Sequence, residues 1–383
     1  MATTKTRLTD RPVAEAAELA ADPERSAAEV PRLYAGVDGG ASKTWAVVGD
    51  GTGRLLGFGA GAGANYHVMG LDFAIDSVLT ALRTAVTAAR SAVGAPPEGA
   101  PSGVLGLLAR SAFYLAGDDT PEDHARLGEA LGKILPPGAA YQWDNDCWAA
   151  LRGGTTRGWG AVCIGGSGTN SAAVAPDGRR AILRGIGRDV GCPGGASDIA
   201  REAVFMAFRM DEGMRPKTRL HGAILEALGL PDYDAVVREY MENSFAFGYR
   251  AMGVVAPLVF RLADEGDEVA QDILIEMGRL MGEQTAAVIR RAGMERLEVE
   301  VVLAGSIYRG SSPLLVDSLT TAVHRTAPRA RPVLPRYHPV VGAYLLALEG
   351  AGLEVGPATY ANLERSLPGL LPEPTAPAVG EPE

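Results

Sequence analysis

Two segments, one in each half of the chain, share a pattern that constrains the fold more than any other feature. They read YAGVDGGASKTWAVVGDG from Tyr34 to Gly51 and GAVCIGGSGTNSAAVAPDG from Gly160 to Gly178. Each contains an apolar run, a turn of glycine and small hydroxyl residues, a second apolar run and an Asp-Gly pair. This pattern predicts one β-hairpin in each half. A repeated hairpin favours two related domains that face each other.

Both turns are suited to anions, because they offer backbone N–H groups and hydroxyls with little side-chain bulk, and phosphate is the usual ligand. The first turn, from Gly36 to Thr44, also contains Asp38. Mg²⁺ is typically held by one or two carboxylates together with phosphate oxygens and water. A tight hairpin alone would need only the Gly-Gly pair, and the Walker sequence GxxxxGK[ST] is absent. We therefore predict a nucleotide-phosphate clamp with Asp38 near a metal ion.

Length and charge limit the alternatives. A chain of 383 residues is too long for one ordinary core, so two domains are expected. The net charge of −10 argues against a nucleic-acid partner, and no apolar run approaches the roughly 20 residues of a membrane span. The sequence shows no secretory signal. Three cysteines, Cys147, Cys163 and Cys192, are too few for a disulfide framework, so we expect a cytoplasmic protein.

Strands and helices alternate along the chain, which predicts an α/β fold. We expect a mobile N-terminal arm at 1–32, an N-terminal lobe at 33–152 and a C-terminal lobe at 153–338. A helix over 339–350 is expected to return to the first lobe. The tail at 357–383 is rich in proline and glutamate and is predicted to be disordered.

Apolar residues at helical spacing predict helices over 71–93, 197–208, 216–228, 268–292 and 313–326. A further helix is expected to begin around Pro121, which suits the first turn of a helix. Buried strands are predicted over 104–116, with a break at 109–111, and over 299–303.

The segment WDNDCWAAL, from Trp143 to Leu151, ends a predicted strand and begins a helix. Two carboxylates flank Asn145. Either of them could simply cap the helix. Alternatively, one of them is a general base that acts on a hydroxyl. We favour Asp146 as this base and Asn145 as a substrate contact, with Asp144 as the weaker candidate.

The remaining candidates bind the nucleotide. In the first turn they are Gly39, Gly40, Ser42, Lys43 and Thr44, and in IGGSGTNS they are Gly166, Ser167, Gly168 and Thr169. The segment VVLAGSIYRGSSPLL, from Val301 to Leu315, predicts a strand, a turn at Gly305 and Ser306, and a helix. Such a turn can cover an adenosine, although any crossover connection could use it.

Taken in order, these segments resemble the motifs of the actin-like, sugar-kinase and Hsp70 ATPase superfamily. They are most similar to the branch shared by N-acetylglucosamine kinases and the activator ATPases of benzoyl-CoA reductase (BadF/BadG/BcrA/BcrD). The similarity spans Leu33 to Glu349, with PVVGAYLLAL, from Pro339 to Leu348, as the closing helix. It implies two ribonuclease H-like domains with ATP in the cleft between them. ROK kinases share a similar Asn-Asp pair, but their Cys-rich zinc motif is missing here.

The resemblance also implies roles for single residues. Asp146 corresponds to the catalytic aspartate that deprotonates the sugar hydroxyl, and Asp38 to the carboxylate near Mg²⁺. Asn65 and Asn170 correspond to positions that meet the sugar.

One stretch departs from the family pattern. Where N-acetylglucosamine kinases carry a GGWG…GDEGS-type segment, this chain reads RGIGRDVGCPGGASDIAREA, from Arg184 to Ala203. Ile186 replaces the tryptophan, and Cys192-Pro193 replaces the Asp-Glu pair whose aspartate hydrogen-bonds the sugar. An unmade bond of this kind costs about 1–3 kcal/mol. Asp189 is our candidate to replace this contact.

The expected function is an ATP-dependent carbohydrate kinase that transfers the γ-phosphate of Mg–ATP to a sugar hydroxyl, with an amino sugar such as N-acetylglucosamine as acceptor. Two alternatives stay open. One is an activator ATPase with an iron–sulfur cluster shared by two subunits, which could use Cys147 and Cys192. However, its NDKCAAGTG-type segment is absent, since Trp148 follows Cys147. The other is a non-catalytic sugar sensor. A homodimer is the most that the resemblance implies about assembly.

Overall fold

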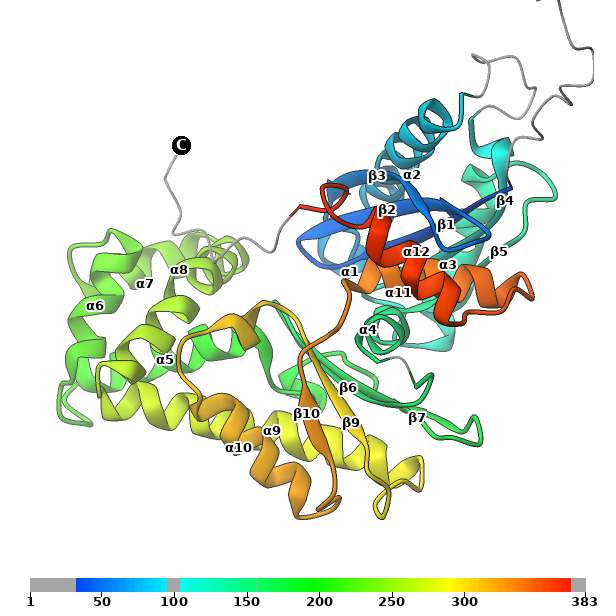
Figure 1. The fold of residues 1–383 in the computed structure, drawn as a ribbon. Coiled ribbons are helices and arrows are strands. Elements are labelled where there is room, and N and C mark those ends of the chain that lie inside the picture. Colours follow the sequence, from blue (N-terminus) through cyan, green and yellow to red (C-terminus); the bar gives the residue numbers. More distant parts are fainter. Residues whose placement is uncertain (1–31, 95–103, 156, 373–383) are drawn as a thin grey trace, which may run out of the picture. The chain divides into compact units, whose positions relative to one another are not determined.

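The computed structural model describes residues 32–94, 104–155 and 157–372. The mobile arm predicted at 1–32 lies outside the described residues except for Arg32, and so do residues 373–383 of the predicted tail. The described residues from Arg32 onward belong to one compact unit. It contains two five-stranded sheets and the helices that cover them (Figure 1).

The first sheet grows out of the first predicted hairpin. Strands β1 (Leu33–Gly39), β2 (Lys43–Asp50) and β3 (Leu55–Ala62) form an antiparallel meander. Strand β4 (Leu108–Leu115) pairs parallel to β1, and β5 (Tyr141–Asn145) pairs parallel to β4. The strand order is therefore β3-β2-β1-β4-β5.

The second sheet repeats this arrangement. Strands β6 (Gly160–Gly165), β7 (Thr169–Val174) and β8 (Arg180–Ile182) form the meander. Strands β9 (Glu300–Ala304) and β10 (Arg331–Val333) add in parallel on the other side of β6, which gives the order β10-β9-β6-β7-β8. Because both sheets place the first meander strand beside the first parallel strand, the predicted α/β fold of two related domains is confirmed.

Helix α2 (Leu71–Ala92) packs on β2 and β3 through a row of glycines. Strand β3 reads LLGFGAGA, so Gly57, Gly59 and Gly61 point to the same face. A Cβ at Gly59 would overlap the carbonyl oxygen of Ala81 on α2, and Gly57 and Gly61 meet α2 in the same way. The alternating glycines therefore permit a close approach between this helix and the sheet.

Helices α4 (Asp146–Gly154) and α11 (Pro339–Gly350) pack against each other, and α11 also packs on β1. Glycines again set the separation, because a Cβ at Gly342 would overlap Ala149 O and one at Gly36 would overlap Tyr344 N. Helices α1 (Tyr66–Met69) and α3 (Pro121–Ile134) complete this part of the chain. The buried helix α11 thus connects the N-terminal hairpin with the helix that begins at Asp146.

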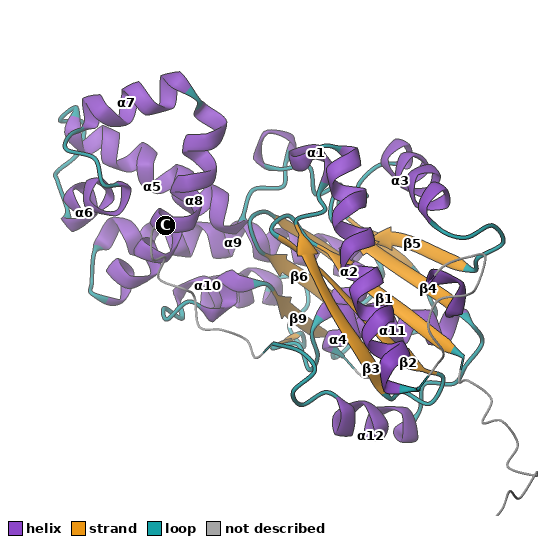
Figure 2. Cartoon of the chain, turned by 90° about the horizontal axis from the view of Figure 1, so that it is seen from above, coloured by secondary structure: helices purple, strands orange, loops and turns teal. Residues whose placement is uncertain are grey.

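Six helices follow or flank the second sheet: α5 (Gly195–Asp211), α6 (Arg219–Leu228), α7 (Tyr233–Glu242), α8 (Ser244–Asp264), α9 (Glu268–Arg291) and α10 (Leu314–His324). Both views show α6 and α7 gathered away from the strands (Figure 2). Helix α8 is long and apolar enough to cross a membrane by length and composition, with 44% of its most apolar stretch buried. A core helix passes the same test, so this observation is weak.

Three sequence predictions differ from the structure. Residues Val104–Leu107 form a 3₁₀ turn and the strand begins only at Leu108. The strand is continuous across the break predicted at 109–111, but its register with β1 shifts at Ala109, since Leu33 pairs with Leu108 and Tyr34 with Arg110. Helices α7 and α8 were not predicted. Residues Pro357–Ser366 form helix α12, so the disordered tail predicted from 357 is wrong for this stretch. The helix is held by side chains, since Asn362 Nδ2 donates to Thr52 O and Leu363 is fully buried.

Candidate functional site

The two Gly-rich turns meet in the structure. Ser42 Oγ of the first turn lies 3.2 Å from Ser167 Oγ of the second, although 125 residues separate them. Each turn is closed by a backbone bond, from Gly40 N to Lys43 O and from Gly166 N to Gly168 O. The predicted pairing of two anion-binding turns therefore corresponds to a real proximity.

The acidic candidates lie at one edge of the first sheet. Strands β1, β4 and β5 are parallel, and their register aligns Gly39 with Leu115 and Leu115 with Asn145. Asp38 stands one residue before the end of β1, and Asp146 follows the end of β5 directly. The loop after β4 contributes the neighbouring acids Asp118 and Asp119. Carboxyl ends of parallel strands are where α/β folds place their ligand sites.

Burial raises the pKa values of three of these carboxyl groups. Burial raises the pKa of Asp38 to about 7, and the nearby positive charge of Lys43 opposes this rise. Burial raises the pKa of Asp146 to about 7, with a further contribution from the charge of Asp38. Burial and the charge of Asp146 raise the pKa of Asp119 to about 7. The three groups thus interact and titrate together, and such perturbed clusters are typical of functional sites.

The two aspartates of the WDND segment differ in their hydrogen bonds. Asp144 accepts hydrogen bonds from Trp148 Nε1 and Arg180 Nη2, both at 2.8 Å, and the Arg180 guanidinium stacks 3.7 Å from the Trp148 ring centre. Asp146 makes no side-chain hydrogen bond with the described residues, and its oxygens receive only backbone N–H groups. Asp146 is therefore the carboxylate that is available to accept a proton.

Asn145, rather than either aspartate, caps helix α4. Its Oδ1 accepts from Cys147 N at 3.0 Å. Its Nδ2 donates to Asp119 Oδ1 at 2.9 Å and to Asp118 O at 3.2 Å. Because both ends of this buried amide are engaged, Asn145 positions Asp119 and α4, and the half-buried Asp119 is the acceptor of the pair that can still meet a ligand.

Asp119 is one residue of the site that the sequence interpretation missed. Gly185 lies against it, since a Cβ at Gly185 would stand 3.1 Å from Asp119 Oδ1 and would also overlap Asn170 Nδ2. The structure therefore brings Asn145, Asp119 and Asn170 together, with Asn170 coming from the second sheet. The signal was the Asp-Asp pair after a buried strand, which we interpreted only as part of a helix start.

Asn65 lies near the same loop. Its Oδ1 caps the short helix α1 by accepting from His67 N at 3.1 Å. A Cβ at Gly117, one residue before Asp118, would stand 2.9 Å from Asn65 Oδ1. The amide nitrogen of Asn65 has no hydrogen-bond acceptor among the described residues, so it is free to bind a ligand.

Asp189 does not join this cluster. It is exposed on the 3₁₀ turn Arg188–Val190, and no described contact connects it with Asn145, Asn170 or Asp119. Asp189 therefore does not take the place of the aspartate that related kinases carry at the position of Cys192. Cys192 itself is buried.

A small cavity of about 290 Å³ lies beside the acidic cluster. Both sheets contribute to its walls, which include Asp119, Asn145, Trp148, Arg180 and Arg291. Trp148 and the stacked Arg180 provide a flat apolar and cationic wall. Such a mixture of one aromatic face and several polar groups suits a small polyhydroxylated ligand.

A model of the BadF/BadG/BcrA/BcrD ATPase family matches residues 35–347. The chain belongs to this family. An N-acetyl-D-glucosamine kinase from Dictyostelium discoideum is 24% identical over 319 residues, which cover 82% of this chain and 98% of that protein. An N-acetylmuramic acid/N-acetylglucosamine kinase from Clostridium acetobutylicum is 24% identical over 238 residues, covering 61% of this chain and 74% of that protein.

One crystal structure supports the fold. It is that of a protein from Chromobacterium violaceum, provisionally named as an N-acetylglucosamine kinase. Its TM-score is 0.63 at 22% identity, over 83% of this chain and 99% of that one. At this identity the likeness shows the fold alone. It agrees with the two related five-stranded sheets described above.

Not every residue predicted to bind the nucleotide presents a free group in this ATPase-family fold. The Thr44 hydroxyl donates to Ala62 O at 2.7 Å, and the Thr169 hydroxyl donates to Ile164 O at 2.8 Å. Gly39 packs against the Leu115 side chain. By contrast, the N–H groups of Ser42 and Ser167 bond to no described backbone carbonyl. The phosphate contacts are therefore expected from Ser42, Ser167 and Gly168, because the N–H groups of Gly40 and Gly166 close their own turns.

The second turn rests on the start of helix α5. Ala196 N donates to Gly166 O at 2.9 Å, and Ser197 N donates to Ser167 O at 3.0 Å. This contact needs Gly195, where φ is +80° and a Cβ would stand 2.5 Å from Gly168 O. The adenosine candidates lie close by, since a Cβ at Gly305 would overlap the backbone of Gly165. Ser306 is exposed beside this contact.

A basic cluster stands beside the first turn. Burial lowers the pKa of His338 to about 4, and the charges of Lys43 and Arg309 add to this shift. Burial also lowers the pKa of Lys43, with Asp38 opposing and Arg309 adding to the shift. Lys43 Nζ lies 3.6 Å from the Trp45 ring centre. Two cations held together near Asp38 suit the phosphates of a nucleotide, and sequence spacing gave no signal for Arg309.

Asp38 offers one carboxylate that could bind a magnesium ion. Within the described ranges, no group of three or more His, Cys, Asp or Glu side chains could hold a metal ion without help. Mg²⁺ does not require such a group, because it usually takes one or two carboxylates and completes its shell with phosphate and water. Asp38, half-buried and beside the first phosphate turn, is suited to be one of these ligands.

Proposed function

We propose that the protein is an ATP-dependent sugar kinase that transfers the γ-phosphate of Mg–ATP to a hydroxyl of an amino sugar such as N-acetylglucosamine. The observation that carries this proposal is the carboxylate of Asp146, which makes no hydrogen bond with a described side chain. It follows the end of β5 and its charge acts on the neighbouring Asp119, which lies with Asn170 against Gly185. Kinase names among the 24%-identical relatives support the reaction class.

In this mechanism the chain supplies position and charge. The turns around Ser42 and Ser167 hold the phosphates through backbone N–H groups, and Lys43 and Arg309 balance their charge. Asp146 accepts the proton of the attacking hydroxyl, while Asp119, Asn65 and Asn170 orient the sugar. When bound, Mg²⁺ neutralises phosphate charge, with Asp38 as its protein ligand. A pKa of about 7 suits Asp146 for this role near neutral pH.

The test is sugar-dependent ADP release with Asp146→Asn and Asp144→Asn as a matched pair. Asp146→Asn removes the base and is expected to lower kcat by about 10²–10⁴-fold while ATP binding persists. Asp144→Asn keeps an oxygen for Trp148 Nε1 and is expected to keep kcat within about tenfold. Equal activity of wild type and Asp146→Asn would refute the assignment of the base. Sugar binding without ADP release by the wild type would favour the sensor alternative.

The activator ATPase is the second candidate, and the described cysteines disfavour it. Cys147, Cys163 and Cys192 are all buried, and burial raises the pKa of Cys147 well above its usual value. A cluster shared between subunits would need accessible thiolates. Iron in anaerobically purified protein would support this candidate. The cytoplasmic location, the homodimer and the absence of nucleic-acid or membrane partners stay predictions from the sequence.

A further inference from the structure

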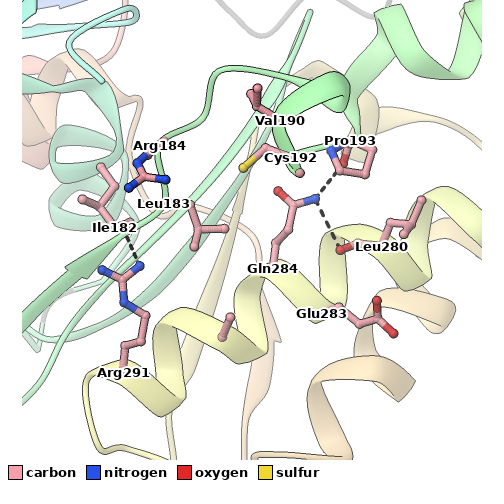
Figure 3. Close-up of a pocket in the computed structure, with 12 residues that line it drawn as sticks. Ile182, Leu183, Arg184, Val190, Cys192, Pro193, Leu280, Glu283, Gln284 and Arg291 are labelled. Atoms are coloured by element: carbon pink, nitrogen blue, oxygen red, sulfur yellow. Dashed lines mark hydrogen bonds between the residues drawn. The ribbon is translucent and has the colours of Figure 1, made fainter. Parts of the chain in front are cut away.

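A second cavity lies next to the acidic one, between helix α9 and the segment 182–193. Its volume is about 610 Å³, which is within the range of small-molecule sites. Figure 3 shows the side chains around it. The polar and reactive groups that line it are Arg184, Cys192, Glu283, Gln284 and Arg291.

Gln284 carries a buried acceptor without a partner. The residue is 7% exposed. Its Nε2 donates to Pro193 O at 2.6 Å and to Leu280 O at 3.3 Å, and these two carbonyls fix the orientation of the amide. Its Oε1 is buried and makes no hydrogen bond with the described residues. Figure 3 shows Oε1 pointing toward the Cys192 side of the cavity, so a ligand there could donate to it.

Two arginines provide hydrogen-bond donors, whereas Gln284 Oε1 is an acceptor. Arg291 Nη1 donates to Ile182 O at 2.8 Å, which uses one of the five N–H groups of a guanidinium. Arg184 makes no hydrogen bond or ion pair with the described residues, and Figure 3 shows both guanidinium groups at the same end of the cavity. The one carboxylate in the lining, Glu283, is paired with Arg279 Nη1 at 2.6 Å. The unpaired charge of the lining is therefore positive.

This cavity continues from the proposed sugar site. Ile182 and Arg291 line both cavities. Arg184 directly precedes Gly185, which lies against Asp119 and Asn170. A ligand whose reacting hydroxyl is near Asp146 could therefore extend a substituent toward Arg184 and Gln284.

We infer that this cavity binds an anionic substituent of the acceptor sugar, with Arg184 and Arg291 holding the anion and Gln284 Oε1 accepting from a hydroxyl or amide N–H. The substituent is a carboxylate or a phosphate, since a guanidinium pairs with either through two parallel bonds. That this sugar is also the phosphoryl acceptor rests on the proposed kinase activity. That the cavity binds an acidic sugar does not rest on it.

The experiment measures binding by calorimetry without ATP, so that it does not depend on turnover. Three pairs of sugars differ in one anionic group: N-acetylglucosamine with N-acetylmuramic acid, glucose with glucuronate, and glucose with glucose 6-phosphate. The acidic member of at least one pair is expected to bind about tenfold or more tightly. The first two pairs test a carboxylate, and the third tests a phosphate.

Variants then assign the contact. Arg184→Gln is expected to weaken binding of the preferred acidic sugar by about tenfold or more and to leave its neutral partner within about twofold. The control is Arg290→Gln, on the same helix as Arg291, where the arginine pairs with Thr326 instead. Arg290→Gln is expected to change neither affinity.

Two outcomes would overturn the inference. One is equal or weaker binding of the acidic member in every pair. The other is an acidic preference that Arg184→Gln leaves intact. ADP release with the same sugars is measured separately. Preferential binding of an acidic sugar with no ADP release from any sugar would refute the kinase proposal and keep the anion site. ADP release from neutral sugars with no preference for the acidic member in binding would do the reverse.

Discussion

Asn145 Nδ2 donates to Asp119 Oδ1 across 2.9 Å, and the same asparagine caps helix α4 through its oxygen. One buried amide thus fixes both the helix that begins at Asp146 and the carboxylate that faces Asn170. The position of the proposed base and that of a proposed sugar contact are coupled through this side chain. Substitution of either Asn145 or Asp119 is expected to weaken sugar binding more than nucleotide binding.

Asp119→Asn tests this expectation. The substitution keeps the shape but replaces a carboxylate acceptor, so sugar hydroxyls lose a charge-assisted bond. We expect KM for the sugar to rise by about 10–100-fold, while KM for ATP stays within about twofold. Steady-state ADP release at varied sugar and at varied ATP measures both. Asp177→Asn in the exposed β7–β8 turn is the control. A rise in KM for ATP alone would contradict the assignment.

The strands that hold the site could be predicted from the sequence because their signals are local. The two hairpins have alternating apolar runs around Gly-rich turns, and both sheets contain them as expected. Helix α9 (Glu268–Arg291) matches the predicted 268–292 because its apolar residues recur at helical spacing. Asp146 could be selected because an Asn-Asp pair between a strand and a helix is a recognisable motif.

The rest of the site depends on contacts between distant segments. Gly185 and Asp119 are 66 residues apart in number, and only the folded chain brings them together. Arg309 reaches Lys43 and His338 in the same way. The hydroxyls of Thr44 and Thr169 match the phosphate motifs, yet each bonds to a backbone carbonyl of its own sheet. Residue type alone does not distinguish a hydroxyl that is free to bind phosphate from one that bonds to a backbone carbonyl.

Arg309→Gln tests the basic cluster. If Lys43 and Arg309 together hold the nucleotide phosphates, removal of one cation is expected to raise KM for ATP by about tenfold and to leave KM for the sugar unchanged. The loss of its charge should also raise the pKa of His338 from about 4, which NMR titration of the imidazole measures. Arg325→Gln, exposed after α10, is the control. An unchanged pKa of His338 would contradict the proximity.

The three aspartates predict a pH dependence of stability in the absence of metal and nucleotide. Their pKa values are raised from 3.8 to about 7 in the folded chain. The folded state therefore binds more protons than the unfolded state between these values, and stability falls as pH rises through this window. Other groups titrate as well, so a variant is needed to isolate the effect.

Asp38→Asn removes one of the interacting charges without a change in shape. We expect the free energy of unfolding of this variant, relative to wild type, to increase by about 1–3 kcal/mol between pH 4.5 and pH 8. Urea unfolding in the presence of EDTA measures the difference at each pH. A difference that is constant with pH would show that Asp38 is ionised normally. The same variant is expected to lose kinase activity, because its metal ligand is gone.

The glycine row on β3 gives a prediction about the scaffold. A Cβ at Gly59 would overlap Ala81 O of α2, so Gly59→Ala must push the helix away from the sheet and is expected to destabilise the protein by about 1–3 kcal/mol. Gly248 on α8 is the matched control, because nothing lies within 4 Å of a Cβ there. Gly248→Ala is expected to stabilise by about 0.5–1 kcal/mol through helix propensity.

Thermal unfolding of the two variants beside wild type measures this contrast. The opposite signs matter, because a general sensitivity of the protein to added methyl groups would destabilise both variants. A stable Gly59→Ala would show that α2 can shift without cost. In that case the alternating glycines of β3 would not set the distance between helix and sheet. Because β3 pairs with β2, whose first residue is Lys43, such a shift would also loosen the support of the first phosphate turn.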